Sequence, residues 1–238
     1  MDPVLKVQNV SKQFGGFTAL SDVSIDIAPG ERFGLIGPNG SGKTTLINCV
    51  SGALRNETGQ IHFQGKDVTR MPAYRRTRLG IARSFQVPRP FHSMSVLENL
   101  LVPSAYVAHI KDSEGEERGM EILRGMGLAD KAQAHASQLS QVELRKLELA
   151  RAMAARPRLL ISDEAMAGLS SAEVDEILAI LTVLNERGIS IIMIEHIMRA
   201  VMRFSHRIIV LDAGHTIAEG TPEEIVHNTA VEKAYFGE

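Results

Sequence analysis

The stretch "GPNGSGKTT", from Gly37 to Thr45, decides the fold of this chain. It follows "RFGLI" at residues 32–36, an apolar run typical of a buried strand, and it leads into "TTLINCVSG", a helical pattern that ends at a glycine. A glycine-rich turn between a strand and a helix lets backbone N–H groups surround a phosphate, and the helix N-terminus adds its dipole. The stretch therefore predicts a nucleotide-binding P-loop.

Individual side chains of this loop have distinct expected contacts. Lys43 would reach the β- and γ-phosphates of a nucleoside triphosphate, and the Thr44 hydroxyl would ligate Mg²⁺. A plain glycine turn would leave both residues unexplained. The predicted nucleotide-binding residues of the loop are Gly37, Pro38, Asn39, Gly40, Ser41, Gly42, Lys43, Thr44 and Thr45.

Two adjacent carboxylates, Asp163 and Glu164, follow an apolar run in "LLISDEA". On its own, such a pair is usually a solvated turn. Downstream of a P-loop, a strand of the same parallel sheet would bring both carboxylates to the edge where the nucleotide binds. We therefore predict that Asp163 holds the Mg²⁺ water shell and that Glu164 polarises the attacking water as the general base.

Two further polar residues follow predicted strands. His196 comes after the apolar run "IIMIE", which would place it at the same sheet edge, although a lone histidine is more often a surface or core residue. Gln86 in "RSFQ" also lies at a strand end, where its amide could sense Mg²⁺ or water. Without the P-loop, Gln86 would be taken for a plain surface glutamine.

The order of patterns along the chain indicates an α/β fold with a largely parallel sheet, the P-loop NTPase core. The opening differs, because "LKVQNV" and "TALSDVSIDI" resemble paired antiparallel strands that precede the first strand–helix unit. Apolar strand patterns occur at residues 32–36, 158–162, 190–195 and 207–212, and a helical pattern covers residues 172–187.

The segment from residue 87 to residue 156 has helical periodicity and no strong strand pattern. We expect it to be a helical subdomain inserted between two strands of the core, with "HIKDSEGEERG" at 109–119 as an exposed loop or helix start. The whole chain, 1–238, would then be a single cassette whose nucleotide-binding core consists of residues 1–86 and 157–238.

Two capping boxes predict helix starts. Thr221 with Glu224, and Pro222 at the first helical position, begin a last helix. Ser140 with Glu143 begins a helix at "LSQVE", and its free N–H groups could also bind an anion. Ser140 is therefore either a helix cap alone or a cap that also contacts phosphate.

Bulk composition excludes several classes of protein. The 238 residues carry a net charge of -2, so the chain has no basic surplus for nucleic acid, and the only cysteine, Cys49, has no second thiol to pair with. No charged segment followed by an apolar core opens the chain, and its apolar runs are far shorter than the ~20 residues needed to span a bilayer. We expect another chain to supply any membrane span.

These motifs together resemble a known family, the ATP-binding subunits of ABC transporters. The motifs that carry the resemblance, in chain order, are Phe14, "GPNGSGKTT", "SFQ" with Gln86, "LSQVELRKLELARA", "LLISDE" and "IEH" with His196. More narrowly, "FGG", "IGPNGSGKTTLIN", "AGLS", "IEHIMRAVM" and the ending "AYFGE" resemble the branched-chain amino-acid importer group.

The resemblance implies further roles. Phe14 would stack on adenine, and Ser140 would contact the γ-phosphate held by a second ATP-binding subunit, because two such subunits close head to tail around two ATP molecules. Gln86 and the following "VPRPFHSMSVLENLL" would lie where a permease helix docks. The chain would hydrolyse ATP with Mg²⁺ to power import.

The resemblance also implies partners and a location. The partners would be hydrophobic permease subunits, a second ATP-binding subunit and, indirectly, a periplasmic or extracellular solute-binding protein, with no nucleic acid. The location would be peripheral, on the cytoplasmic face of the inner (plasma) membrane. Two alternatives remain: a soluble ABC-type ATPase, and a non-hydrolysing ATP-gated assembly module.

The signature segment departs from the family pattern. The pattern is LSGGQ, or close to LSYGEQ in the importer group, and Val142 stands here where the second glycine would be. A β-branched side chain would hinder the approach of backbone to phosphate. We therefore hypothesise a heterodimer with one slow ATP site; the alternative is that the Val142 N–H still reaches phosphate and the sites are equivalent.

Overall fold

A computed structural model describes residues 2–110 and 112–236 of the chain. The helices are α1 Lys43–Ser51, α2 Ala73–Leu79, α3 Val96–Tyr106, α4 Asp112–Gly125, α5 Gln141–Ala154, α6 Ser171–Glu186, α7 Met198–Phe204, α8 Pro222–Val226 and α9 Thr229–Phe236, with short 3-10 turns at Ala129–Lys131 and Ala136–Gln138. The strands are β1 Leu5–Phe14, β2 Phe17–Ile27, β3 Arg32–Ile36, β4 Thr58–Phe63, β5 Lys66–Asp67, β6 Ile81–Ser84, β7 Leu159–Asp163, β8 Ser190–Ile194, β9 Arg207–Asp212 and β10 His215–Gly220.

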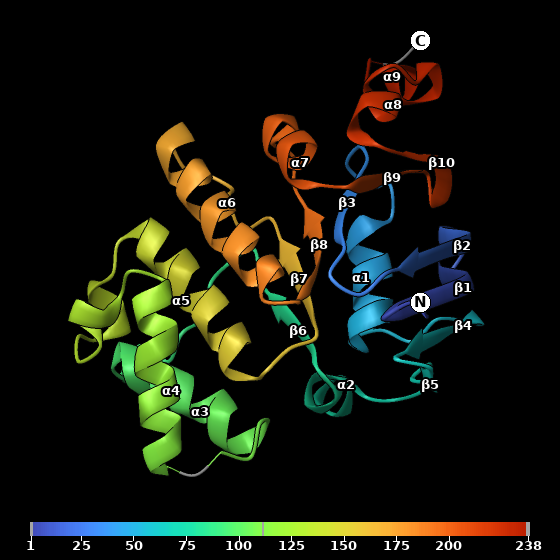
Figure 1. Cartoon of the computed structure of the whole chain (residues 1–238). Coiled ribbons are helices and arrows are strands. Elements are labelled where there is room, and N and C mark those ends of the chain that lie inside the picture. The colour runs from blue at the N-terminus through green and yellow to red at the C-terminus, as the bar shows by residue number, and fades with distance from the viewer. Residues whose placement is uncertain (1, 111, 237–238) are drawn as a thin grey trace.

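A six-stranded sheet forms the centre of the molecule (Figure 1), in the order β10-β9-β3-β8-β7-β6. Pairing is parallel from β9 to β6, and only β10 pairs antiparallel. All residues of β7 and β8 are buried, as expected for strands that helices cover on both faces. The carboxyl ends of β3, β6, β7 and β8 therefore meet at one edge, and the predicted α/β fold class is confirmed.

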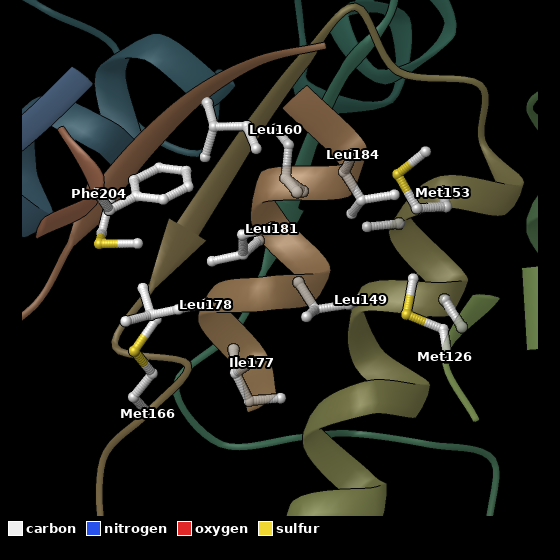
Figure 2. Packing of buried hydrophobic residues seen from close by; sticks show 14 of the residues in the cluster. Met126, Leu149, Met153, Leu160, Met166, Ile177, Leu178, Leu181, Leu184 and Phe204 are labelled. Atoms are coloured by element: carbon white, nitrogen blue, oxygen red, sulfur yellow. The ribbon is translucent and has the colours of Figure 1, made fainter. Parts of the chain in front are cut away.

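Successive side chains of the central strands point to opposite faces of this sheet, which builds two cores. Leu160 joins a cluster with α5 and α6, where Figure 2 shows it beside Leu181 and Leu184. Leu159 and Ile161 join a second cluster with α1 and the N-terminal strands, which also encloses the fully buried thiol of Cys49. The sheet is thus buried on both faces.

The N-terminal strands form a separate four-stranded antiparallel sheet in the order β2-β1-β4-β5. The predicted pairing of β1 with β2 is confirmed, with Val7 opposite Ile25, and β1 also pairs with β4, where Val7 lies opposite Ile61. The sequence did not reveal β4, because "TGQIHF" offers only two large apolar side chains. Helix α1 lies between the two sheets (Figure 1).

Helices α3, α4 and α5 pack on one another at one side of the molecule (Figure 1). Within the described part of residues 87–156 there is no strand, and α4 covers most of the polar segment that we expected to be a loop or helix start; Lys111 of that segment lies outside the described residues. The limits 87 and 156 of a separate subdomain stay a prediction.

The predicted capping boxes are present at the N-termini of two helices, α5 and α8. Ser140 begins α5, where its hydroxyl accepts the N–H of Glu143, and Thr221 begins α8 in the same way with Glu224. Residues 234–236 of the ending "AYFGE" continue α9, whereas Gly237 and Glu238 lie outside the described residues.

Candidate nucleotide-binding site

The P-loop joins the end of β3 to the start of α1, and two of its positions admit only glycine. Gly37 has φ 151° and Gly42 has φ 104°, both in the left-handed region that side chains disfavour. A Cβ at Gly37 would lie 2.1 Å from the Leu211 carbonyl oxygen, and one at Gly42 would lie 2.6 Å from that of Ala19. The loop therefore packs closely against β9 and β2, and at these two positions there is no room for a side chain.

Lys43, the first residue of α1, is 6% exposed, and its ammonium group lies inside the loop. Nζ donates hydrogen bonds to the carbonyl oxygens of Gly37 at 2.7 Å and Pro38 at 2.9 Å. Burial lowers the pKa of Lys43, while the charges of Glu164 and Asp163 act in the opposite direction. Lys43 therefore interacts electrostatically with Asp163 and Glu164, the two carboxylates predicted to lie at this site.

Glu164 follows β7 in a strained, left-handed conformation with φ 47°. Its amide donates to the Ile194 carbonyl oxygen at 2.9 Å, which ties it to the end of β8. Its carboxylate lies between two side chains: Oε1 is 3.1 Å from His196 Nε2, and Oε2 accepts the side-chain amide of Gln86. The structure thus brings together Gln86, Glu164 and His196, which the sequence places more than 100 residues apart at its extremes.

Arg83 is a site residue that sequence reasoning missed. From β6, its Nη2 lies 2.5 Å from Asp163 Oδ2 in an ion pair that is almost completely buried, and its Nη1 donates to Asn48 Oδ1 at 2.7 Å. The available signal was a charged residue in the middle of an otherwise buried strand, "IARS". Arg83 fixes the direction in which Asp163 points.

The residues predicted to hold Mg²⁺ fit that ion. Mg²⁺ prefers oxygen ligands and keeps several waters, so it takes only one or two groups from the protein. Asp163 Oδ1 and the exposed Thr44 hydroxyl have no hydrogen-bond partner among the described residues, and the Gln86 amide lies beside Glu164. No group of three acidic, histidine or cysteine side chains in the described ranges forms a fuller metal cage.

Phe14 lies at the end of β1, in the hairpin to β2, and its ring is 47% exposed. The ammonium of Lys12 is 5.1 Å from the centre of this ring. Since the P-loop abuts β2 at Ala19, the hairpin that carries Phe14 lies on the same side as the loop. An exposed aromatic face is therefore offered near the loop, as stacking on a base requires.

Ser140 is not brought to the P-loop of its own chain by any contact among the described residues. Within the described part of the chain its hydroxyl and amide bond only with Glu143, whose carboxylate also pairs with Lys131 at 2.5 Å. The side chain of Val142 is half-buried against the core cluster of α5 and α6. A phosphate contact of Ser140 would therefore involve a nucleotide held by another chain.

Comparison with known proteins agrees with this geometry. The model of the family described as ABC transporter matches residues 20–167, and the model described as Branched-chain amino acid ATP-binding cassette transporter matches residues 215–238. A relative from Archaeoglobus fulgidus, named "Probable branched-chain amino acid transport ATP-binding protein LivG", is 39% identical over 98% of this chain and 95% of its own length.

Solved structures also resemble this chain over most or all of its length. The ADP conformation of an ATP-binding cassette of an ABC transporter is 32% identical, covers 100% of both chains and superposes with a TM-score of 0.91. A dimeric cassette in a post-hydrolysis state, bound to ADP and phosphate, is 26% identical over 92% of this chain and 98% of its own, with a TM-score of 0.82.

A P-loop at the edge of a parallel sheet, faced by Asp163 and Glu164, defines a nucleoside triphosphatase of the P-loop class. The chain belongs to the ABC transporter family and is one of its ATP-binding cassettes. It is therefore an ATPase of the kind that powers transport, and it binds nucleotide, which confirms the family resemblance read from the sequence.

Proposed function

We propose that this chain is the ATP-hydrolysing subunit of an importer for branched-chain amino acids or similar small organic solutes. The observation that carries the proposal is the match of residues 215–238 to the branched-chain amino acid cassette family, in the same chain as the P-loop, Asp163 and Glu164. The name of the Archaeoglobus relative supports the same solute class. None of the described helices combines the length and apolar character needed to cross a bilayer.

The proposed roles of the site residues follow from their contacts. Lys43 binds the β- and γ-phosphates, and Glu164 accepts a proton from the attacking water while His196 and Gln86 hold its carboxylate in place. Bound through oxygens of Thr44, Gln86 and Asp163, Mg²⁺ would neutralise charge that develops on the phosphates. Phe14 stacks on adenine.

ATP-binding cassettes of ABC transporters work with membrane permease subunits and dimerise. We propose that a short cytoplasmic helix of a permease docks in a groove of about 350 Å³ on this chain. The groove is lined mostly by apolar side chains of α2, β6, α3, α5 and the loop after β6. That loop carries the exposed rings of Phe85 and Phe91, and Tyr106 of α3 adds a third exposed ring. Phe85 precedes Gln86, so a docked helix lies one residue from a contact of Glu164. Docking would place the chain peripherally on the cytoplasmic face of the membrane.

A charge in this groove is expected to weaken assembly with the permease. Tyr106→Asp places an unpaired carboxylate where an apolar helix must pack, so co-purification of the permease with the tagged chain should fall about tenfold. ATP affinity should not change, because Tyr106 does not contact the P-loop residues. Tyr74→Asp is the matched control, since Tyr74 is exposed but does not line the groove. Equal co-purification of both variants would show that the helix docks elsewhere.

The two ATP sites of the working pair are proposed to be unequal, in a heterodimer with a second ATP-binding subunit. On this proposal the branched Cβ of Val142 keeps the backbone from phosphate even though the side chain packs half-buried on the core. Ser140→Ala in this chain should then lower the ATPase rate of the complex less than about twofold, whereas loss of Glu164 should nearly abolish it. Steady-state phosphate release by the reconstituted complex measures both. A loss from Ser140→Ala as deep as that from the Glu164 variant would mean equivalent sites.

Reconstitution tests the function as a whole. The membrane complex captured with this chain is placed in liposomes with ATP, and uptake of radiolabelled leucine through its solute-binding protein is measured. ATP-dependent uptake supports the proposal. Absence of any multi-span membrane protein from the captured material would favour a soluble ATPase, and uptake without phosphate release would favour a non-hydrolysing module.

A further inference from the structure

Glu195 is a buried carboxylate beside the site, and the roles proposed above do not use it. It follows β8 directly, is 2% exposed and accepts the backbone N–H of Met166 at 2.9 Å through Oε1. Burial raises the pKa of Glu195 to about 7, and the nearby charge of Glu164 adds to the rise, while the amides of Met166 and His196 and the charge of Arg145 act against it. A polar group kept at this depth needs a reason, because burying it costs free energy.

The segment 194–196 holds Glu164 and Met166 through three contacts. The Ile194 carbonyl oxygen accepts the Glu164 amide at 2.9 Å, and the His196 ring contacts the Glu164 carboxylate at 3.1 Å. The third contact is the hydrogen bond that the Glu195 carboxylate accepts from the Met166 amide. The neighbours Glu195 and His196 therefore act on opposite sides of the same turn: the first binds its backbone from the interior, and the second meets its carboxylate at the surface.

The other side of this turn is held by α5 and by the core. Arg145 of α5 donates to the Ala167 carbonyl oxygen at 3.2 Å and to the Gln86 carbonyl oxygen. The Met166 side chain is fully buried and packs near Leu178, as Figure 2 shows. Residues 164–167 thus lie between two buried ionisable side chains, the acid Glu195 and the base Arg145.

We propose that Glu195 is a positioning residue for ATP hydrolysis: by accepting the Met166 amide it sets the backbone at residues 164–167 and so places the Glu164 carboxylate. The proposal rests on the role of Glu164 as general base. A shift of a catalytic group by about 1 Å can cost on the order of 10²-fold in rate, so a single lost backbone contact two residues away is enough to matter.

Glu195→Gln tests this with almost no change in volume. The Glu195 carboxylate accepts the Met166 amide through Oε1 and has two acceptor oxygens, whereas a glutamine offers one acceptor oxygen and places an N–H₂ donor in the position of the other. In the intact complex, kcat for ATP should fall about 10- to 100-fold, while KM and the Kd for ATP stay within about twofold of wild type. Amide hydrogen exchange at residues 164–168 should become faster.

Glu186→Gln is the matched control, because it makes the same chemical change at an exposed position near the end of α6, where Glu186 forms no hydrogen bond or ion pair through its side chain among the described residues. It should leave kcat and exchange as in wild type. Should Glu195→Gln not fold, Glu195→Asp keeps the carboxylate but withdraws it by one methylene, and the same loss of kcat at retained ATP affinity is expected.

The outcomes separate this inference from the proposed function. A kcat for Glu195→Gln within about twofold of wild type overturns it, and so does a loss of ATP affinity in proportion to the loss of rate. Measurement of Glu164→Gln alongside identifies the failing step. If the Glu164 variant is inactive and the Glu195 variant is fully active, only the positioning role of Glu195 is contradicted. If the Glu164 variant is active, the role of Glu164 as general base is contradicted, and with it the proposed function of the site.

Discussion

Glu164→Gln is expected to bind ATP as tightly as wild type and to hydrolyse it more slowly by on the order of 10²-fold or more. The carboxylate of Glu164 lies between His196 at 3.1 Å and the Gln86 side-chain amide. Glutamine has nearly the same shape as glutamate, so residues 164–167 and the P-loop keep their positions. It cannot accept the proton of the attacking water, so only the chemical step is lost.

The measurement is phosphate release by the reconstituted complex at saturating ATP, together with ATP affinity by calorimetry. Glu186→Gln serves as the control for an exposed glutamate and should hydrolyse ATP at the wild-type rate. A Glu164→Gln complex that turns over at close to the wild-type rate would mean that Glu164 is not the base.

Lys43→Ala is expected to weaken ATP binding itself, by about 10- to 100-fold. The Lys43 ammonium is buried inside the P-loop and held by the Gly37 and Pro38 carbonyl oxygens, so it is already positioned for phosphate. It is also a cation close to Asp163 and Glu164, beside the Arg83 that pairs with Asp163. Its removal leaves the phosphates of ATP near two carboxylates without that compensating charge.

Calorimetric titration of ATP into the purified variant measures the effect. Lys66→Ala removes an equal charge from an exposed position on β5 and should leave the affinity unchanged. ATP affinity for Lys43→Ala that matches wild type would rule out the proposed contact between Lys43 and the phosphates, however well the loop geometry fits it.

Much of the nucleotide site could be read from the sequence because its parts are local. The P-loop needs only a strand, a glycine turn and a helix in succession, and all of these lie within residues 32–52. Asp163, Glu164 and His196 could be found because each follows an apolar run, and parallel strands end at the same sheet edge. Gln86 was predicted to lie at a strand end, and in the structure it lies two residues after the last residue of β6.

Contacts between distant segments could not be read in the same way. The pairing of Arg83 with Asp163 requires β6 and β7 to be neighbours, and no local pattern states the order of strands in a sheet. Strand β4 was missed because its polar residues face solvent, and it is a strand through its pairing with β1 and β5. The groove that we propose as a docking site forms where α2, β6, α3, α5 and the loop after β6 converge.

The sequence by itself determined the P-loop, the α/β class, the capping boxes of α5 and α8 and the family, since each depends on residue types at short, regular spacings. Only the tertiary structure decided that Gln86 and His196 meet Glu164 from two sides, that Arg83 orients Asp163 and that Glu195 holds the Met166 amide. The physical reason is that a buried charge or amide must find its partner wherever packing places one, and packing joins residues that are far apart in the chain.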